Sequence, residues 1–242
     1  MQTKKRYTHI FFDLDNTLWD FSKNSFYAMR FTFDSFLTKS QNIQFGHFFE
    51  IYSKHNHALW AEYRNKNIGK RELIRKRFQN TFDELKIDGI DAEQMNSFYL
   101  EEMPKQKILI DGALDILHYM RNKRYQLFII TNGFKEVQNK KLENSGLKSF
   151  FQKVFISEDI KTPKPGVEIF EYAIKSANAK KAGSLMIGDN WEGDILGAAG
   201  FGIDSVYFTT EKGKLEKQKN IGIKNKNSVY IINHLVHLQD IL

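Results

Sequence analysis

Hydrophobic and polar positions follow three different patterns along the chain. An apolar run of aromatic and branched residues, 10–12, predicts a short buried strand near the start. Between residues 18 and 103 the apolar positions recur at helical spacing and include a phenylalanine-rich stripe, which predicts a helical bundle with those rings in its core. From Ile108 onward, strand-like and helix-like segments alternate.

The alternating region predicts a parallel sheet. Its strand-like segments are 125–130, 154–157, 184–187 and 205–208, with a further edge strand at 230–232. Helix-like segments such as 111–122 and 167–176 lie between them. Strands that alternate with helices of this length are joined by right-handed crossovers in an α/β fold. Ligands of such sheets bind beyond the carboxyl ends of the strands.

Polar side chains follow three of the predicted strands. They are Asp13 and Asp15 after the first strand, Thr131 and Asn132 after the second, and Asp189 before the last crossover. Lys164 lies in a proline-flanked loop between two strands, where the rigid backbone can fix its direction. Because the carboxyl ends of parallel strands share one edge of a sheet, these groups predict a single site.

The two acids after the first strand carry a chemical constraint. Residues i and i+2 of a strand point to the same side, so we expect Asp13 and Asp15 to converge on one small volume. Two such charges repel unless a cation lies between them or one takes a proton. Mg²⁺, which prefers oxygen ligands, would supply that cation. The alternative is an ordinary turn, because Asp, Asn and Thr are common turn residues.

Composition narrows the functional classes. At 242 residues, 41% hydrophobic and 27% charged, the chain is long enough for a sizeable core and has globular proportions. The absence of cysteine excludes a disulfide framework, a thiolate metal site and a cysteine nucleophile. No apolar stretch approaches the roughly 20 residues that span a bilayer. We therefore expect a cytoplasmic protein without a membrane partner.

The net charge of +7 predicts attraction to anions. Six lysines lie in one late segment without aromatic residues among them, which favours a solvated loop over a nucleic-acid-binding surface. They are Lys212, Lys214, Lys217, Lys219, Lys224 and Lys226. We expect a small phosphorylated substrate and no nucleic-acid partner.

The motifs and their order resemble the haloacid dehalogenase (HAD) superfamily of phosphohydrolases. They are the segment 13–17 (DLDNT), the segment 131–133 (TNG), Lys164 followed by proline, and Gly188-Asp189 with Asp194 five residues on. The resemblance implies a Rossmann-like catalytic core made of residues 1–17 and 108–242, with the first strand central. It implies that residues 18–107 form an inserted all-helical cap domain.

The resemblance also implies a role for each motif residue. Asp13 would be the nucleophile that forms an aspartyl-phosphate, and Asp15 the general acid and base. The alternative for the Asp15 side chain is that it is only a second metal carboxylate. In the family, this residue supplies the metal with its backbone carbonyl instead. The implied ligands of Mg²⁺ are Asp13, Asp15 through that carbonyl, Asp189 and Asp194.

The phosphoryl group would be held by Thr131, Asn132 and Lys164. Lys161 is a rival for the lysine position, but only Lys164 precedes proline as the family pattern requires. Taken alone, Asp194 is equally an acid on a helix surface; the Gly-Asp-x-x-x-x-Asp spacing favours a place in the site.

Substrate choice is expected to depend on the cap. The segments 56–63, 129–134 and 156–159 resemble the pyrimidine-preferring nucleoside 5′-monophosphatases of the superfamily, which implies a nucleoside monophosphate substrate. Trp60 or Tyr63 would stack on a base, or Trp60 would belong to the cap core.

Lys70 and Arg71, near the Gly69 turn, would reach a substrate anion. The alternatives to a nucleotidase are a phosphosugar or phosphoglycolate phosphatase, a phosphomutase, or a non-catalytic phosphate-binding module. We expect a monomer or a homodimer.

Overall fold

The computed structural model describes residues 7–37, 43–210 and 227–242. The chain divides into two compact units, one made of residues 1–21 and 108–242 and the other of residues 22–107. We predicted the first boundary at residues 17 and 18. It lies later because the outgoing and returning segments pair with each other: Trp19 forms an antiparallel bridge with Leu109, and Leu18 accepts a hydrogen bond from the Ile110 amide.

The core unit is built on a six-stranded sheet in which every neighbouring pair is parallel. The strands are β1 (His9–Phe12), β2 (Gln126–Thr131), β3 (Lys153–Ile156), β4 (Ser184–Gly188), β5 (Asp204–Phe208) and β6 (Val229–Ile232). Their order is β3-β2-β1-β4-β5-β6. The predicted α/β fold is therefore confirmed, with β1 in the interior of the sheet and β6 at one edge.

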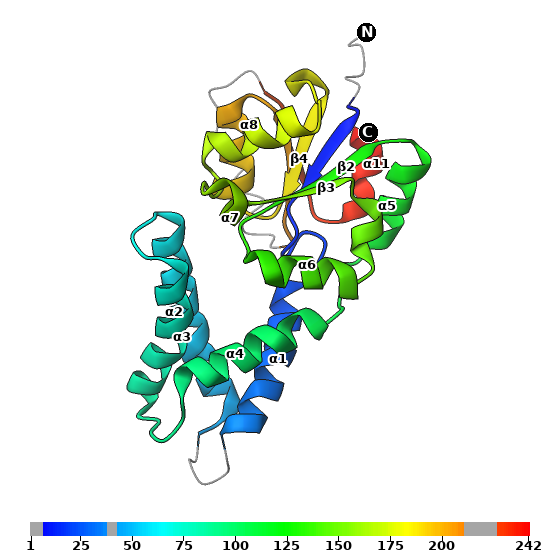
Figure 1. Ribbon diagram of the computed structural model, residues 1–242. Helices are drawn as coiled ribbons and strands as arrows, with labels where there is room; N and C mark the ends of the chain where they lie inside the picture. Colours follow the sequence, from blue (N-terminus) through cyan, green and yellow to red (C-terminus); the bar gives the residue numbers. More distant parts are fainter. Residues whose placement is uncertain (1–6, 38–42, 211–226) are drawn as a thin grey trace. The chain divides into compact units, whose positions relative to one another are not determined.

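Helices cover both faces of this sheet, and Figure 1 shows α5 and α8 on opposite sides of it. The α-helices of the core are α5 (Ala113–Asn122), α6 (Lys135–Asn144), α7 (Ser157–Ile160), α8 (Val167–Ser176), α9 (Gly197–Phe201) and α11 (Leu238–Ile241). Short 3₁₀ turns occupy 147–150, 181–183 and 235–237. One further element was not predicted: a π-helix, η5 (Trp191–Leu196), precedes α9.

One apolar core joins the sheet to α8 and α9. Phe11 and Phe128 stack on neighbouring strands with ring centroids 5.0 Å apart, and Phe170 and Phe201 stack from the helices. Because the interior strands are covered on both faces, they read as nearly continuous apolar runs in the sequence.

The second unit is entirely helical in its described part. It contains α1 (Phe21–Phe36, whose first residue belongs to the core unit), α2 (Phe45–Arg64), α3 (Lys70–Leu85), α4 (Ala92–Glu102) and a 3₁₀ turn at 103–105. Phe33 packs against Phe48, and Phe78 against Tyr99. The stripe on α1 is only partly buried, however, because Phe26 is 40% exposed.

Two expectations concern the surroundings of the protein. Within the described residues, no helix is both long enough and apolar enough to cross a bilayer. The six lysines of the late segment lie outside the residues that the structure describes.

The core packing makes a prediction for Phe170, whose side chain is fully buried between α8, α9 and the sheet. Phe170→Ala should lower the free energy of unfolding by about 3–5 kcal/mol, because it removes a buried ring and leaves a cavity. Val167→Ala on the same helix is the control, since Val167 is 47% exposed; its effect should stay within about 0.5 kcal/mol. Urea unfolding followed by circular dichroism measures the free energy of unfolding of both variants. Equal losses for Phe170→Ala and Val167→Ala would contradict the central place of Phe170 in the core.

Candidate active site

The strand register brings the predicted polar groups to one edge of the sheet. Phe12 is level with Ile129 on β2 and with Ile187 on β4, so these three strands end close together. Asp13 continues the ladder for one more residue, because its amide donates to the Ile187 carbonyl at 2.8 Å. Thr131 is the last residue of β2. The site therefore follows from the alignment of three parallel strands.

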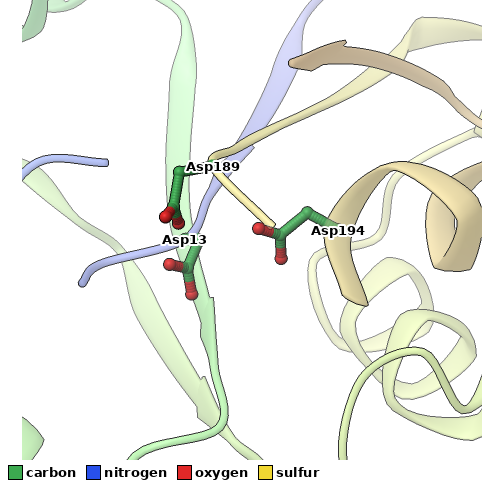
Figure 2. Close-up of side chains that lie close together, drawn as sticks. All are labelled: Asp13, Asp189 and Asp194. Atoms are coloured by element: carbon green, nitrogen blue, oxygen red, sulfur yellow. The ribbon is translucent and has the colours of Figure 1, made fainter. Parts of the chain in front are cut away.

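Three carboxylates meet at this edge. One oxygen each from Asp13, Asp189 and Asp194 lies within 4.8 Å of the others, and Figure 2 shows the three side chains close together. Asp194 is fully buried, and its Oδ2 accepts a hydrogen bond from the Asn190 amide at 3.0 Å. A Cβ at Gly188 would lie 2.1 Å from that same Oδ2, so only glycine admits the carboxylate here.

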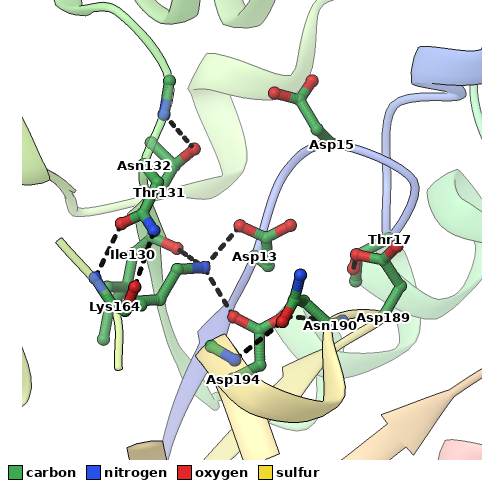
Figure 3. Close-up of polar contacts among 12 residues, drawn as sticks. Asp13, Asp15, Thr17, Ile130, Thr131, Asn132, Lys164, Asp189, Asn190 and Asp194 are labelled. Atoms are coloured by element: carbon green, nitrogen blue, oxygen red, sulfur yellow. Dashed lines mark hydrogen bonds and ion pairs between the residues drawn. The ribbon is translucent and has the colours of Figure 1, made fainter. Parts of the chain in front are cut away.

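Lys164 provides the positive charge of the cluster. Its buried ammonium donates to Asp13 at 2.6 Å, to Asp194 at 2.6 Å and to the Ile130 carbonyl at 2.8 Å (Figure 3). The loop is held by Asn132, whose Oδ1 accepts from the Lys164 amide at 2.8 Å and whose Nδ2 donates to the Lys164 carbonyl at 3.0 Å. Both ends of the Asn132 amide are therefore engaged in placing Lys164. The second hydrogen of its NH₂ group stays available for the predicted contact with substrate.

The charges of the cluster perturb one another. Burial raises the pKa of Asp13 to about 7; the Lys164 ammonium opposes this, and the carboxylates of Asp194 and Asp15 add to it. Burial likewise raises the pKa of Asp189 to about 8, with Asp13 contributing. Burial by itself would lower the pKa of Lys164, but its two carboxylate partners raise that pKa above its ordinary value. The cluster is short of positive charge.

Asp15 does not join this cluster. Its carboxylate lies apart from that of Asp13 (Figure 3) and is held by Lys141 at 2.7 Å and by the Gln138 amide nitrogen at 3.0 Å. The expected convergence of the two aspartates is therefore wrong for the side chain of Asp15. The reason is that the chain has left the strand by this point: Asp15 bridges to Trp19, and the strand alternation no longer applies.

Several contacts of the site were not foreseen. The Thr17 hydroxyl lies 3.4 Å from the Asp189 carboxylate, and Asn190 caps η5 by accepting from the Gly193 amide at 2.7 Å. Gln138 and Lys141 are both buried on α6. A signal for them existed in the sequence, because polar residues occupy two positions of the apolar face of that helix.

The remaining candidates lie elsewhere. Lys161, the rival of Lys164, is exposed to solvent. Trp60 is half-buried on α2 and meets the Tyr63 ring edge-on, with centroids 5.5 Å apart. Lys70 and Arg71 form the first turn of α3 in the helical unit.

Comparison with known proteins gives consistent matches. The family model described as haloacid dehalogenase-like hydrolase matches residues 7–202. The chain is 34% identical to pyrimidine 5′-nucleotidase PynA of Streptococcus pneumoniae over 84% of each chain. It is 32% identical to pyrimidine 5′-nucleotidase YjjG of Escherichia coli, covering 80% of this chain and 82% of that one.

A solved structure agrees as well. The crystal structure of the putative HAD-hydrolase YfnB of Bacillus subtilis, which is bound to magnesium, superposes with a TM-score of 0.82 at 29% identity. The match covers 98% of this chain and 99% of YfnB. A family match over most of the chain and relatives above 30% identity, together with the motif geometry at the sheet edge, show that this chain belongs to the haloacid dehalogenase-like hydrolases and is an enzyme of their phosphatase type.

Proposed function

We propose that the protein is a magnesium-dependent phosphomonoester hydrolase that forms a phosphorylated Asp13 and acts on nucleoside 5′-monophosphates with pyrimidine bases. The observation that carries the proposal is the position of Asp13: its carboxylate is held by Lys164 at 2.6 Å beside two further acids. A second carboxylate, that of Asp15, lies near but outside the cluster and is available for proton transfer.

The donor set suits Mg²⁺. The oxygens of Asp13, Asp189 and Asp194 are hard ligands within 4.8 Å of one another, and burial raises the pKa of Asp13 and of Asp189. These residues, with the backbone carbonyl of Asp15, would hold the ion. Bound Mg²⁺ supplies charge that neutralises the oxygens of the transferring phosphoryl group.

The reaction then divides between the two aspartates. The Asp13 carboxylate attacks phosphorus in line, and the bond from phosphorus to the ester oxygen breaks as Asp15 gives that oxygen its proton. Asp15 then accepts a proton from the water that attacks the aspartyl-phosphate, which releases phosphate and restores Asp13. Lys164 holds Asp13 in position and offsets negative charge, and the Thr131 hydroxyl contacts a phosphoryl oxygen.

The preference for pyrimidine nucleotides is supported by the relatives. Two proteins named pyrimidine 5′-nucleotidases, at 34% and 32% identity, cover most of this chain. The helical unit carries aromatic and basic side chains suited to a nucleotide, namely Trp60, Tyr63, Lys70 and Arg71.

Asp13→Asn should reduce kcat/KM on a phosphate monoester by roughly 10³- to 10⁶-fold, because the amide is a far weaker nucleophile. Asp111→Asn is the control, since the Asp111 side chain is 96% exposed. Rapid quench of the native enzyme should trap an acyl-phosphate that hydroxylamine cleaves and that the Asp13→Asn variant lacks. A variant with near-native turnover would refute the nucleophile assignment.

Metal binding should depend on pH. In the metal-free protein Asp189 binds its proton more tightly than in the unfolded chain, because its pKa is about 8 against 3.8. The pKa of Asp13 is likewise raised, to about 7. The free energy of unfolding should therefore fall as pH rises from about 4 to about 8, and Mg²⁺ should reverse this fall. The Lys164 ammonium lowers the pKa of both carboxyls, whereas the carboxylates of Asp194 and Asp15 raise it.

Calorimetric titration with Mg²⁺ should show affinity rising with pH up to about 8 and protons released on binding. EDTA should abolish turnover, and added Mg²⁺ should restore it. Asp189→Asn should raise the Mg²⁺ concentration for half-maximal activity by roughly 10- to 100-fold, as the loss of a supporting ligand commonly does. Activity that persists in EDTA would contradict metal dependence.

A phosphate-release screen tests the substrate class. Deoxyuridine, thymidine and uridine 5′-monophosphates should show higher kcat/KM than phosphoglycolate and sugar phosphates, because only the nucleotides offer a base for stacking. Equal or better rates on the small phosphates would overturn the nucleotide preference and leave the hydrolase assignment intact. An isomerised phosphate in place of free phosphate would identify a mutase.

A further inference from the structure

We propose that Lys141 and Gln138 are positioning residues that hold the carboxylate of Asp15 for proton transfer to the leaving group. The inference rests on the proposed function, which gives Asp15 the role of acid and base. Lys141 and Gln138 lie three positions apart on α6, so their side chains emerge on one face of the helix. Both are almost completely buried.

Lys141 binds one oxygen of Asp15 and two aromatic faces. Its ammonium lies 2.7 Å from Asp15 Oδ1, 4.3 Å from the centroid of the Trp19 ring and 5.3 Å from that of Phe21. The Lys141 side chain is 2% exposed, whereas that of Asp15 is 27% exposed. The ammonium is thus fixed in a closed aromatic environment, and the carboxylate it holds remains open to a reactant.

Gln138 binds the other oxygen of Asp15. Its Nε2 donates to Asp15 Oδ2 at 3.0 Å and to the Thr131 hydroxyl oxygen at 2.7 Å. The side chain passes over Gly133, where a Cβ would lie 2.4 Å from Gln138 Cδ. Glycine in the 131–133 motif is therefore needed for this contact. With both oxygens engaged, the Asp15 carboxylate has one orientation instead of several.

The same amide orients the Thr131 hydroxyl. That oxygen accepts hydrogen bonds from Gln138 Nε2 and, at 3.4 Å, from the Gly133 amide. A hydroxyl that accepts two hydrogen bonds still has its own proton to donate. Donation is the polarity that a phosphoryl oxygen requires. Gln138 thus connects the proton-transfer group to the phosphate-binding group.

A purely structural role for Lys141 is the competing explanation. A buried ion pair stabilises a fold poorly, because the cost of removing the ammonium from water offsets its attraction to the carboxylate. An apolar side chain packed between Trp19 and Phe21 would stabilise the fold at least as much as the ion pair of Lys141 with Asp15 does. The partner of Lys141 is moreover the one aspartate of the motif that lies outside the acid cluster. The arrangement is better explained by catalysis than by stability.

The test compares two leaving groups. A nucleoside 5′-monophosphate releases a poor leaving group that needs a proton, whereas p-nitrophenyl phosphate releases a stable anion that does not. Lys141→Met keeps the apolar stem but frees Asp15. It should lower kcat/KM for thymidine 5′-monophosphate by about 10²-fold and for p-nitrophenyl phosphate by much less. Asp15→Asn should show the same selectivity more strongly.

Lys140→Met is the matched control, because Lys140 is the exposed neighbour on the same helix. This variant should leave kcat/KM unchanged for both substrates. Lys141→Arg should restore part of the loss on thymidine 5′-monophosphate, since it returns a cation to Asp15. The double variant Asp15→Asn/Lys141→Met should be no slower than Asp15→Asn alone, because both changes act through one group.

Equal losses on the two substrates for Lys141→Met, or additive losses in the double variant, would overturn the proposal and assign Lys141 to stability. Gln138→Leu provides a second test should Lys141→Met fail to fold. It should lower kcat/KM on both substrates, since Thr131 serves the phosphoryl group that they share, and more on the nucleotide. An Asp15→Asn enzyme with no leaving-group selectivity would instead refute the proposed role of Asp15 itself.

Discussion

The contact between the Lys164 ammonium and the carboxylates of Asp13 and Asp194 is the interaction on which this site depends. Three acids are held within 4.8 Å at a largely buried sheet edge, where their charges disfavour one another. One buried lysine, bonded at 2.6 Å to two of the acids, provides the positive charge nearest to them. Burial still raises the pKa of Asp13 and Asp189, so each of these carboxyls holds a proton more readily than a free carboxyl does.

The rest of the core can be understood as the support of that contact. Parallel pairing of β1 with β2 and β4 aligns the strand ends. The Ile130 carbonyl accepts the third hydrogen bond of Lys164, and Asn132 fixes the backbone on both sides of the lysine. The supports come from the ends of β1, β2 and β4 and from the loop that carries Lys164, which is why segments so distant in sequence form one compact site.

Much of this arrangement was predictable because it depends on periodicity. The predicted strands agree with the observed ones to within a residue or two, since interior parallel strands read as apolar runs. The positions of Asp13, Thr131 and Asp189 followed from the rule that strand ends hold the ligand. That of Lys164 followed from its proline-flanked loop and from the family pattern. What the sequence could not reveal depends on departures from regular geometry. The π-helix that carries Asp194 has no periodic signature, and Phe26 is 40% exposed on an otherwise apolar stripe.

The position of Asp15 is the most informative of these departures. Strand alternation predicted that Asp15 would share a cation with Asp13. The chain turns between the two residues, however, and Asp15 contacts Lys141 whereas Asp13 contacts Lys164. Different partners can give two neighbouring carboxylates different roles. In the proposed reaction one aspartate attacks phosphorus while the other exchanges a proton with the ester oxygen, so the two carboxylates must face different atoms. A regular strand would direct both side chains to the same side, whereas the turn after β1 places Asp13 and Asp15 in different surroundings.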